Sequence, residues 1–195
     1  KVVTFDQTNW RTKREIAGGG ILLDQGIHLV DLMRMIAGEF TDIKSFVSNN
    51  YWKFDVEDNV YVIMKTDDDI VGMLHSSATQ WKHRFNLEVN LEKGSVIFSG
   101  ILSGSKSYGS EKLTVINVKP KEKSSDIKEI TTSYKKDYSW DRELEYFTEC
   151  ILTNKKIEFS SSKDALKTMK LVNNIYYSDK VWRTKYGIQH SDQSI

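Results

Sequence analysis

The sequence contains one cysteine, Cys150, and one proline, Pro120, in 195 residues. A single cysteine cannot form an internal disulfide, which favours a reducing compartment and predicts a cytoplasmic protein. A membrane helix needs an apolar run of about 18 residues, and the sequence has none. No signal peptide is visible either, so we expect no membrane association. The formal net charge is only +1, which gives no electrostatic case for nucleic acid as a partner.

A dinucleotide-binding loop is also missing. Gly18, Gly19 and Gly20 would need a third spaced glycine where Leu23 stands, and a buried strand before the loop, whereas the segment 10–15 is polar and basic. The chain therefore shows no nucleotide-binding domain. The glycines instead predict a flexible entry to a helix, which lets its N-terminus approach other backbone closely and aims its free N–H groups at a ligand.

The composition, 39% hydrophobic and 28% charged, is ordinary for a soluble globular protein. The spacing of the apolar residues changes after Gly38 from a helical period to strict alternation. Short turns separate the alternating segments, which is typical of an antiparallel meander. We expect an α+β fold with an open, predominantly antiparallel sheet and helices packed on one face. One domain is expected over 1–187, with a polar tail at 188–195 and loops at 100–110 and 119–126. The predicted strands cover 43–52, 56–66, 70–79, 85–92, 95–99, 113–118 and 127–132.

Two helices are expected near the end of the chain. Ser139 is predicted to cap the first, and Ser161, with Asp164 three residues later, resembles a capping box for the second. Both helices carry an apolar stripe that we interpret as core. The stripes are Trp140, Leu144, Phe147 and Ile151 in the first helix and Ala165, Met169, Val172 and Tyr176 in the second.

Three ionisable residues give the strongest functional signal. Asp24, His28 and Asp31 fall within an arc of about 60° on a helix that is otherwise apolar, so the pattern predicts their burial. Buried carboxylates and imidazoles are costly unless paired, which indicates a polar pocket at the edge of the core. The i, i+4 spacing predicts contact between Asp24 and His28. A satisfied structural pair and a metal site remain alternatives, although no second cluster at ligand spacing accompanies these residues.

Several motifs together resemble the C-terminal domain of the glucose-fructose oxidoreductase, inositol dehydrogenase and rhizopine-catabolism (Gfo/Idh/MocA) family. The resemblance extends over nearly the whole chain. Its pieces are Trp10-Arg11, Gly18-Gly19-Gly20, Asp24-x-Gly26-x-His28-x-x-Asp31, Val56-Glu57-Asp58-Asn59, Leu91-Glu92-Lys93-Gly94-Ser95 and Ser162 through Tyr177.

The resemblance implies an N-terminal Rossmann domain that binds NAD or NADP and that is absent from this chain. It also implies that this chain supplies the substrate site and a homo-oligomer interface through the sheet. The family's Glu-Lys-Pro motif has no counterpart, because Pro120 is preceded by Lys119 and Val118 in a late loop. We therefore expect the full-length protein to be an enzyme and the isolated chain to be inactive.

The implied reaction is the oxidation of a secondary alcohol on a sugar, nucleotide sugar or cyclitol. His28 is the candidate base, because imidazole titrates near neutrality, and Asp24 would fix its tautomer. A non-catalytic dimerisation or ligand-binding module, and a metal-dependent hydrolase or isomerase using Asp24, His28 and Asp31, are the alternatives. The candidate substrate-binding residues are Trp10, Arg11, Arg14, Asp31, Trp81 and His83.

Overall fold

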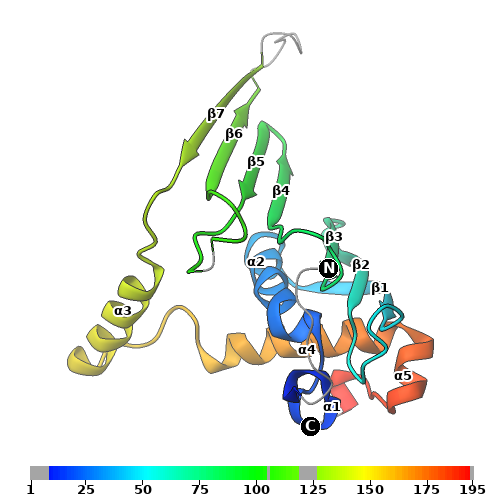
Figure 1. Cartoon of the computed structure of the whole chain (residues 1–195). Coiled ribbons are helices and arrows are strands. Elements are labelled where there is room, and N and C mark those ends of the chain that lie inside the picture. The colour runs from blue at the N-terminus through cyan, green and yellow to red at the C-terminus, as the bar shows by residue number, and fades with distance from the viewer. Residues whose placement is uncertain (1–8, 105, 119–126, 194–195) are drawn as a thin grey trace. The chain divides into compact units, whose positions relative to one another are not determined.

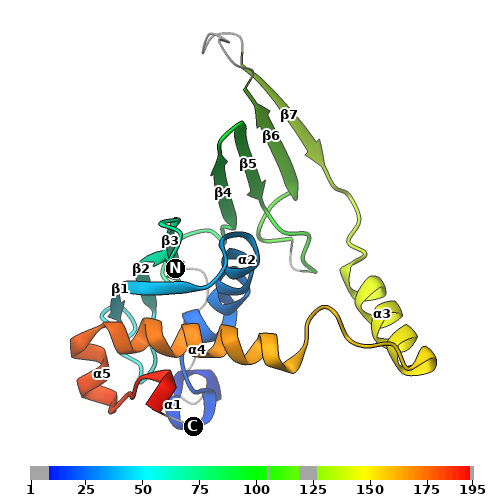
Figure 2. The same cartoon turned by 180° about the vertical axis from the view of Figure 1, so that it is seen from behind.

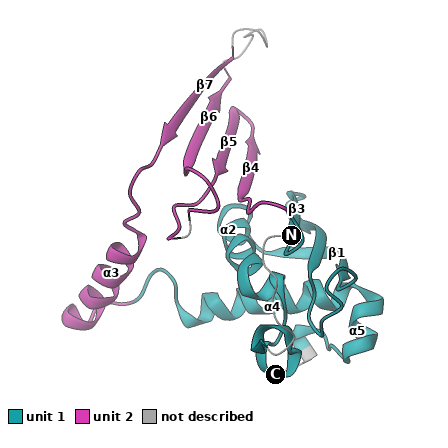
Figure 3. Cartoon of the chain, viewed as in Figure 1, with its two compact units in different colours: residues 1–80, 157–195 teal, residues 81–156 magenta. Residues whose placement is uncertain are grey.

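The computed structural model describes residues 9–104, 106–118 and 127–193, so the predicted loop at 119–126 lies outside the described residues. The chain divides into two compact units, shown in teal and magenta in Figure 3. Unit 1 combines residues 1–80 with 157–195, and unit 2 is residues 81–156. All seven predicted strands are present, and they form two antiparallel sheets rather than one.

Unit 1 contains a three-stranded sheet in the order β1 (Phe40–Ser48), β2 (Asn59–Thr66), β3 (Val71–Ser77). Strand β2 alternates between buried and exposed residues, so its two faces differ. Val60, Val62 and Met64 are buried, whereas Tyr61 and Ile63 are about half exposed. Cross-strand pairing places Phe46 and Met73 on the exposed face too. The sheet therefore has one covered face and one open, partly apolar face.

The covered face packs against helices. Helix α4 (Ser162–Ser178) runs along β1 and also contacts α2 (Ile27–Ala37), as Figures 1 and 2 show from opposite sides. The expected packing of helices on one face is thus confirmed for this sheet. The shorter elements of unit 1 are η1 (Trp10–Thr12), α1 (Arg14–Ala17), η2 (Leu22–Gly26), α5 (Lys180–Tyr186) and η4 (Ser191–Gln193). The core consists chiefly of Leu22, Val30, Met33, Val60, Val62, Met64, Leu74, Leu171, Val172, Ile175, Tyr176 and Trp182.

Helix α4 begins as predicted, because the Ser161 hydroxyl accepts a hydrogen bond from the Asp164 N–H at 3.2 Å. Its predicted stripe is correct only in its second half: Val172 and Tyr176 are buried, whereas Ala165 and Met169 are exposed. The buried stripe is shifted around the helix to Thr168, Leu171, Val172, Ile175 and Tyr176.

A third C-terminal helix, α5, was not expected. Asp179 has an extended backbone and its carboxylate accepts the N–H of Trp182 at 2.9 Å, so this residue both ends α4 and caps α5. The other carboxylate oxygen of Asp179 accepts the N–H of Val47 at 2.8 Å. The new helix buries Trp182 in the core of unit 1.

Unit 2 contains a four-stranded antiparallel meander, β4 (Asn86–Leu91), β5 (Gly94–Ser99), β6 (Lys112–Asn117) and β7 (Lys128–Ser133), and the helix α3 (Ser139–Thr153). Cys150 is the one buried residue in the described part of unit 2. The cross-strand register nevertheless gathers apolar side chains on one face of the sheet. They are Leu87, Val89, Leu91, Val96, Phe98, Leu113, Val115 and Ile130.

The predicted burial of the α3 stripe is wrong. Trp140, Leu144, Phe147 and Ile151 are all between 57% and 73% exposed. Ser139 is not the cap either, since the carboxylate of Asp137 accepts the Ser139 N–H at 2.8 Å. An amphipathic pattern establishes that a helix has an apolar face, and it does not establish that the same chain covers that face.

Within the described ranges, no helix is both long enough and apolar enough to span a bilayer.

Candidate functional site

The polar stripe of the site helix faces solvent. Asp24, His28 and Asp31 are exposed, so the predicted burial is wrong. The side of η2 and α2 that points into the core carries Leu22, Gly26, Val30, Met33 and Arg34 instead. Because these residues recur at helical spacing, the stripe at 24, 28 and 31 is the outer side of the same amphipathic helix.

The predicted contact between Asp24 and His28 is absent as well. In the described part of the chain, no hydrogen bond or ion pair joins the two side chains, and Asp24 instead lies 3.8 Å from Arg11 Nε. Both partners of that ion pair are 44% exposed. Residues 22–26 form a π-helical turn, which is wider than an α-helical turn. The side chains of Asp24 and His28 therefore do not have the relative orientation of an i, i+4 pair in an α-helix.

Arg11 is held on a short 3-10 turn. The Asn9 side chain accepts the Arg11 N–H at 3.0 Å and thereby caps η1. The Arg11 guanidinium lies 4.4 Å from the centre of the Trp10 ring. Trp10, Arg11 and Asp24 are thus brought together in the folded chain.

These three residues line a pocket of about 190 Å³ in unit 1. The pocket has three aromatic side chains and an acid–guanidinium pair, an arrangement that suits a ligand with apolar faces and polar edges. His28, Arg14 and Asp31 are not among the lining residues. The complete lining is Trp10, Arg11, Thr12, Ala17, Gly19, Gly20, Ile21, Leu23, Asp24, Trp52, Phe54, Val56, Glu57, Asp58 and Ala78.

Glu57 anchors the pocket, and no role was predicted for it beyond its place in the family motif. Its carboxylate is buried and accepts hydrogen bonds from Gly20 N–H at 2.8 Å, Leu22 N–H at 3.0 Å and the Tyr176 hydroxyl at 2.7 Å. Burial raises the pKa of Glu57, and burial together with the nearby Glu57 charge raises the pKa of Tyr176 well above its ordinary value.

The glycine entry works differently from the prediction in one respect. Gly20 does permit a close approach, because the Glu57 carbonyl oxygen occupies the space that a side-chain carbon would need. The N–H groups of Gly20 and Leu22, however, are bonded to Glu57 and are not aimed at a ligand. An acidic residue at the entry to an apolar strand was the signal that could have indicated this cap.

Asp58, the next residue, holds the aromatic wall of the pocket. It is buried, and one carboxylate oxygen accepts the N–H groups of Tyr51 and Trp52, both at 2.9 Å. The Asn49 side chain donates to the Phe54 carbonyl at 2.5 Å, which closes the loop between β1 and β2. The rings of Trp52 and Phe54 stack 5.9 Å apart at an interplanar angle of 4°.

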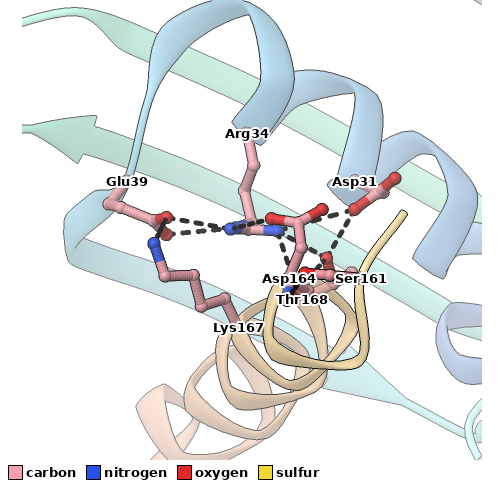
Figure 4. Close-up of polar contacts among 7 residues, drawn as sticks. All are labelled: Asp31, Arg34, Glu39, Ser161, Asp164, Lys167 and Thr168. Atoms are coloured by element: carbon pink, nitrogen blue, oxygen red, sulfur yellow. Dashed lines mark hydrogen bonds and ion pairs between the residues drawn. The ribbon is translucent and has the colours of Figure 1, made fainter. Parts of the chain in front are cut away.

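Asp31 belongs to a different cluster, drawn in Figure 4. The Asp31 carboxylate accepts the Thr168 hydroxyl at 2.5 Å and lies 3.5 Å from Arg34 Nη1. The buried Arg34 guanidinium makes two hydrogen bonds to the Glu39 carboxylate, at 2.8 and 3.0 Å, and one to the Asp164 carboxylate at 3.2 Å. The hydrogen bonds from Arg34 lower the pKa of Glu39 to about 2. The cluster ties α2 to α4, which points to a structural role for Asp31.

The other predicted substrate residues also lie outside the pocket lining. The Arg14 guanidinium lies over the rings of Tyr176, Trp182 and Tyr186, at 5.5, 6.0 and 4.6 Å from their centres. Trp81 and His83 belong to unit 2, where Trp81 is exposed. The His83 ring stacks on Tyr108, 4.9 Å between centres, and its Nδ1 bonds the Ser107 hydroxyl.

The metal alternative finds no support in the geometry. Among the described residues, no group of three or more His, Cys, Asp or Glu side chains is arranged to hold a metal ion. Asp24, His28 and Asp31 all lie within those residues, and Asp24 and Asp31 pair with different cations.

Residues 2–97 match the sequence profile of the GFO/IDH/MocA C-terminal domain. The fold of the remaining residues agrees with it, since solved oxidoreductases match most of the chain. Residues 2–97 of this chain belong to the GFO/IDH/MocA C-terminal-domain family. Among curated proteins, none matches this sequence.

Three solved structures illustrate the GFO/IDH/MocA fold. Aldose-aldose oxidoreductase from Caulobacter crescentus, complexed with glycerol, is 22% identical, with a TM-score of 0.72 over 91% of this chain and 50% of that one. Levoglucosan dehydrogenase with NADH and levoglucosan is 18% identical, with a TM-score of 0.69 over 87% of this chain and 51% of that one. The WlbA dehydrogenase from Bordetella pertussis, with NADH and UDP-GlcNAcA, is 17% identical, with a TM-score of 0.61 over 87% and 45%. The chain thus spans about half the length of these structures.

Proposed function

We propose that this GFO/IDH/MocA domain is the substrate-binding and oligomerisation part of an NAD- or NADP-dependent oxidoreductase that acts on a secondary alcohol of a sugar, nucleotide sugar or cyclitol. The observation that carries the proposal is the aromatic pocket with Asp24 and Arg11 in its lining, built on the glycine entry of the site helix. The solved relatives bound to levoglucosan or UDP-GlcNAcA support this substrate class. A single cysteine among 195 residues supports a cytoplasmic location.

The cofactor would be held mainly by a domain outside this chain. The sequence has no glycine fingerprint after a buried strand, so its residues do not fit the pyrophosphate of a dinucleotide. When bound by its own domain, a nicotinamide would supply the hydride chemistry. The residues of this chain would bind the alcohol and manage its proton.

His28 is the proposed base. It does not line the pocket, but it is exposed one turn beyond Asp24, so its imidazole is open to a hydroxyl group that a bound substrate presents past Asp24. The imidazole nitrogen would accept the hydroxyl proton as the carbon is oxidised, and the Asp24 carboxylate would stabilise the imidazolium that forms. Asp24 already forms an ion pair with Arg11. During the reaction its carboxylate would therefore interact with both the Arg11 guanidinium and the His28 imidazolium.

The test uses the full gene product that contains this chain, assayed with NAD and NADP against sugars and nucleotide sugars. His28→Ala and Asp24→Asn should each lower kcat by about a hundredfold or more, with little change in stability, because general-base loss has that scale. Asp31→Asn is the matched control on the same helix and should affect turnover least. The assignment fails if His28→Ala keeps near-normal kcat/KM on the true substrate.

Self-association through the sheets is the second part of the proposal. The open face of β1–β3 carries Phe46, Ile63 and Met73, which are each more than half exposed. The sheet of unit 2 has an apolar face but buries no residue of its own in the described ranges. Sheets with an uncovered apolar face are usually paired or covered, so a homodimer or tetramer is expected.

A further inference from the structure

We propose that Trp52 and Phe54 determine the specificity of the site by stacking against the ring of one monosaccharide. The inference rests on the proposed function and adds the surface that would recognise the sugar. The sequence motifs do not predict a role for either residue. Both lie in the loop between β1 and β2, and they line the same pocket as Gly19 and Gly20 only in the folded chain.

The ring wall is preorganised. Trp52 and Phe54 are stacked nearly parallel, and both line the pocket. Asp58 accepts the N–H groups of Tyr51 and Trp52, while Asn49 donates to the Phe54 carbonyl. A wall fixed from both ends loses little conformational entropy when a ligand stacks on it, which favours binding.

The chemistry of the pocket matches a sugar. Pyranose rings have apolar C–H faces, which pack on aromatic side chains, and hydroxyl edges, which need hydrogen-bonding partners. Asp24 and Arg11 supply an acceptor and donors, and their partial exposure leaves them accessible. Glu57 and Asp58 are already bonded within the protein, so the Asp24–Arg11 pair is the charged group available to the ligand.

The small volume of the pocket favours a ligand with a single ring. Its volume of about 190 Å³ lies below the range of about 300–1,000 Å³ that is common for drug-sized ligands. A nucleotide attached to the sugar would therefore lie outside the wall formed by Trp52 and Phe54. Asp58 is a positioning residue in this scheme, because it acts on the ligand only through the backbone of the loop.

The experiment titrates the 195-residue chain with glucose, N-acetylglucosamine, UDP-N-acetylglucosamine and NADH, using tryptophan fluorescence and saturation-transfer NMR. We expect saturable binding of a monosaccharide in the millimolar range, and saturation of the sugar protons rather than the uridine protons. Trp52→Ala should weaken binding about tenfold or more, whereas Trp52→Phe, which keeps a ring, should stay within about threefold. Trp140→Ala, on the exposed face of α3, is the matched control and should bind like wild type.

The positioning role of Asp58 has its own readout. Asp58→Ala should weaken sugar binding although Trp52 and Phe54 are still present, and Asp58→Asn should restore part of it, because the amide keeps one acceptor oxygen. Circular dichroism of each variant checks that the chain is folded. Trp52→Phe and Asp58→Asn carry the test if the alanine variants do not fold.

Three results would overturn the inference: no saturable binding of either monosaccharide up to about 50 mM, unchanged affinity in Trp52→Ala, or displacement of the sugar by NADH through its nicotinamide ring. The outcome is separable from that of the proposed function. If the wall binds sugar but His28→Ala leaves turnover unchanged, only the catalytic assignment fails. If turnover depends on His28 but Trp52→Ala leaves KM unchanged, only the ring wall fails.

Discussion

The buried carboxylate of Glu57 gives the sharpest test of how the pocket is held together. One oxygen accepts the Gly20 N–H, and the other accepts both the Leu22 N–H and the Tyr176 hydroxyl. A carboxylate satisfies all three donors because both of its oxygens are acceptors. A glutamine in the same place has only one acceptor oxygen, so in either amide orientation its NH₂ group faces a backbone N–H.

The magnitudes follow from this count of donors. Glu57→Gln leaves one buried N–H without a partner and should cost about 1–3 kcal/mol. Glu57→Ala leaves three donors unsatisfied and also creates a cavity, so it should cost about 4 kcal/mol or more, a large share of the stability of a domain. Tyr176→Phe removes one hydrogen bond to a charged group, worth about 1.5–3 kcal/mol.

Urea unfolding, monitored by circular dichroism, measures these costs for the wild type and for Glu57→Gln, Glu57→Ala and Tyr176→Phe. The double variant Glu57→Gln with Tyr176→Phe measures the energetic coupling between the two residues. The single-variant costs should not add, because both changes act on the same hydrogen-bonded cluster around residue 57. Hydrogen exchange should also show faster exchange at the Gly20 and Leu22 amides. Tyr134→Phe, at an exposed tyrosine, is the control. A cost below about 0.5 kcal/mol for Glu57→Ala would refute the reasoning, since that is the scale of ordinary surface substitutions.

Three further predictions concern other parts of the molecule. The chain alone should not bind NAD(H) appreciably, because it lacks a glycine fingerprint, and micromolar affinity by calorimetry would contradict this. The chain should sediment as a dimer or tetramer at tens of micromolar, and comparing Ile63→Asp with Val115→Asp should show which sheet forms the interface; a wild-type monomer would end the proposal. Glu39, whose pKa is lowered from 4.5 to about 2 by Arg34, should contribute stability above pH 4.5 and lose it as the pH falls toward 2. The stability difference between wild type and Glu39→Gln should therefore shrink over that interval, and a difference that grows there would contradict the assignment.

The sequence by itself determined the strands, because their signals are local. Alternation along residues such as Phe85, Leu87 and Val89, and turn residues such as Asp69 and Gly94, set the period and the breaks without reference to the rest of the chain. The cap of α4 at Ser161 is equally local, and the structure confirms it. The family motifs from Trp10 to Ser95 were also readable in order along the chain, and the profile match over residues 2–97 agrees with them.

Only the tertiary structure decided which faces are covered and which polar groups are satisfied. Periodicity placed Asp24 and His28 on one side of a helix, but burial depends on what packs against that side, and here the opposite side meets the core. The same reason left Trp140 exposed on α3. Glu57 bonds Gly20 across 37 residues of sequence, and Trp52 and Asp24 line one pocket only in the folded chain. Such contacts depend on how distant segments pack together, which no local pattern of residues encodes.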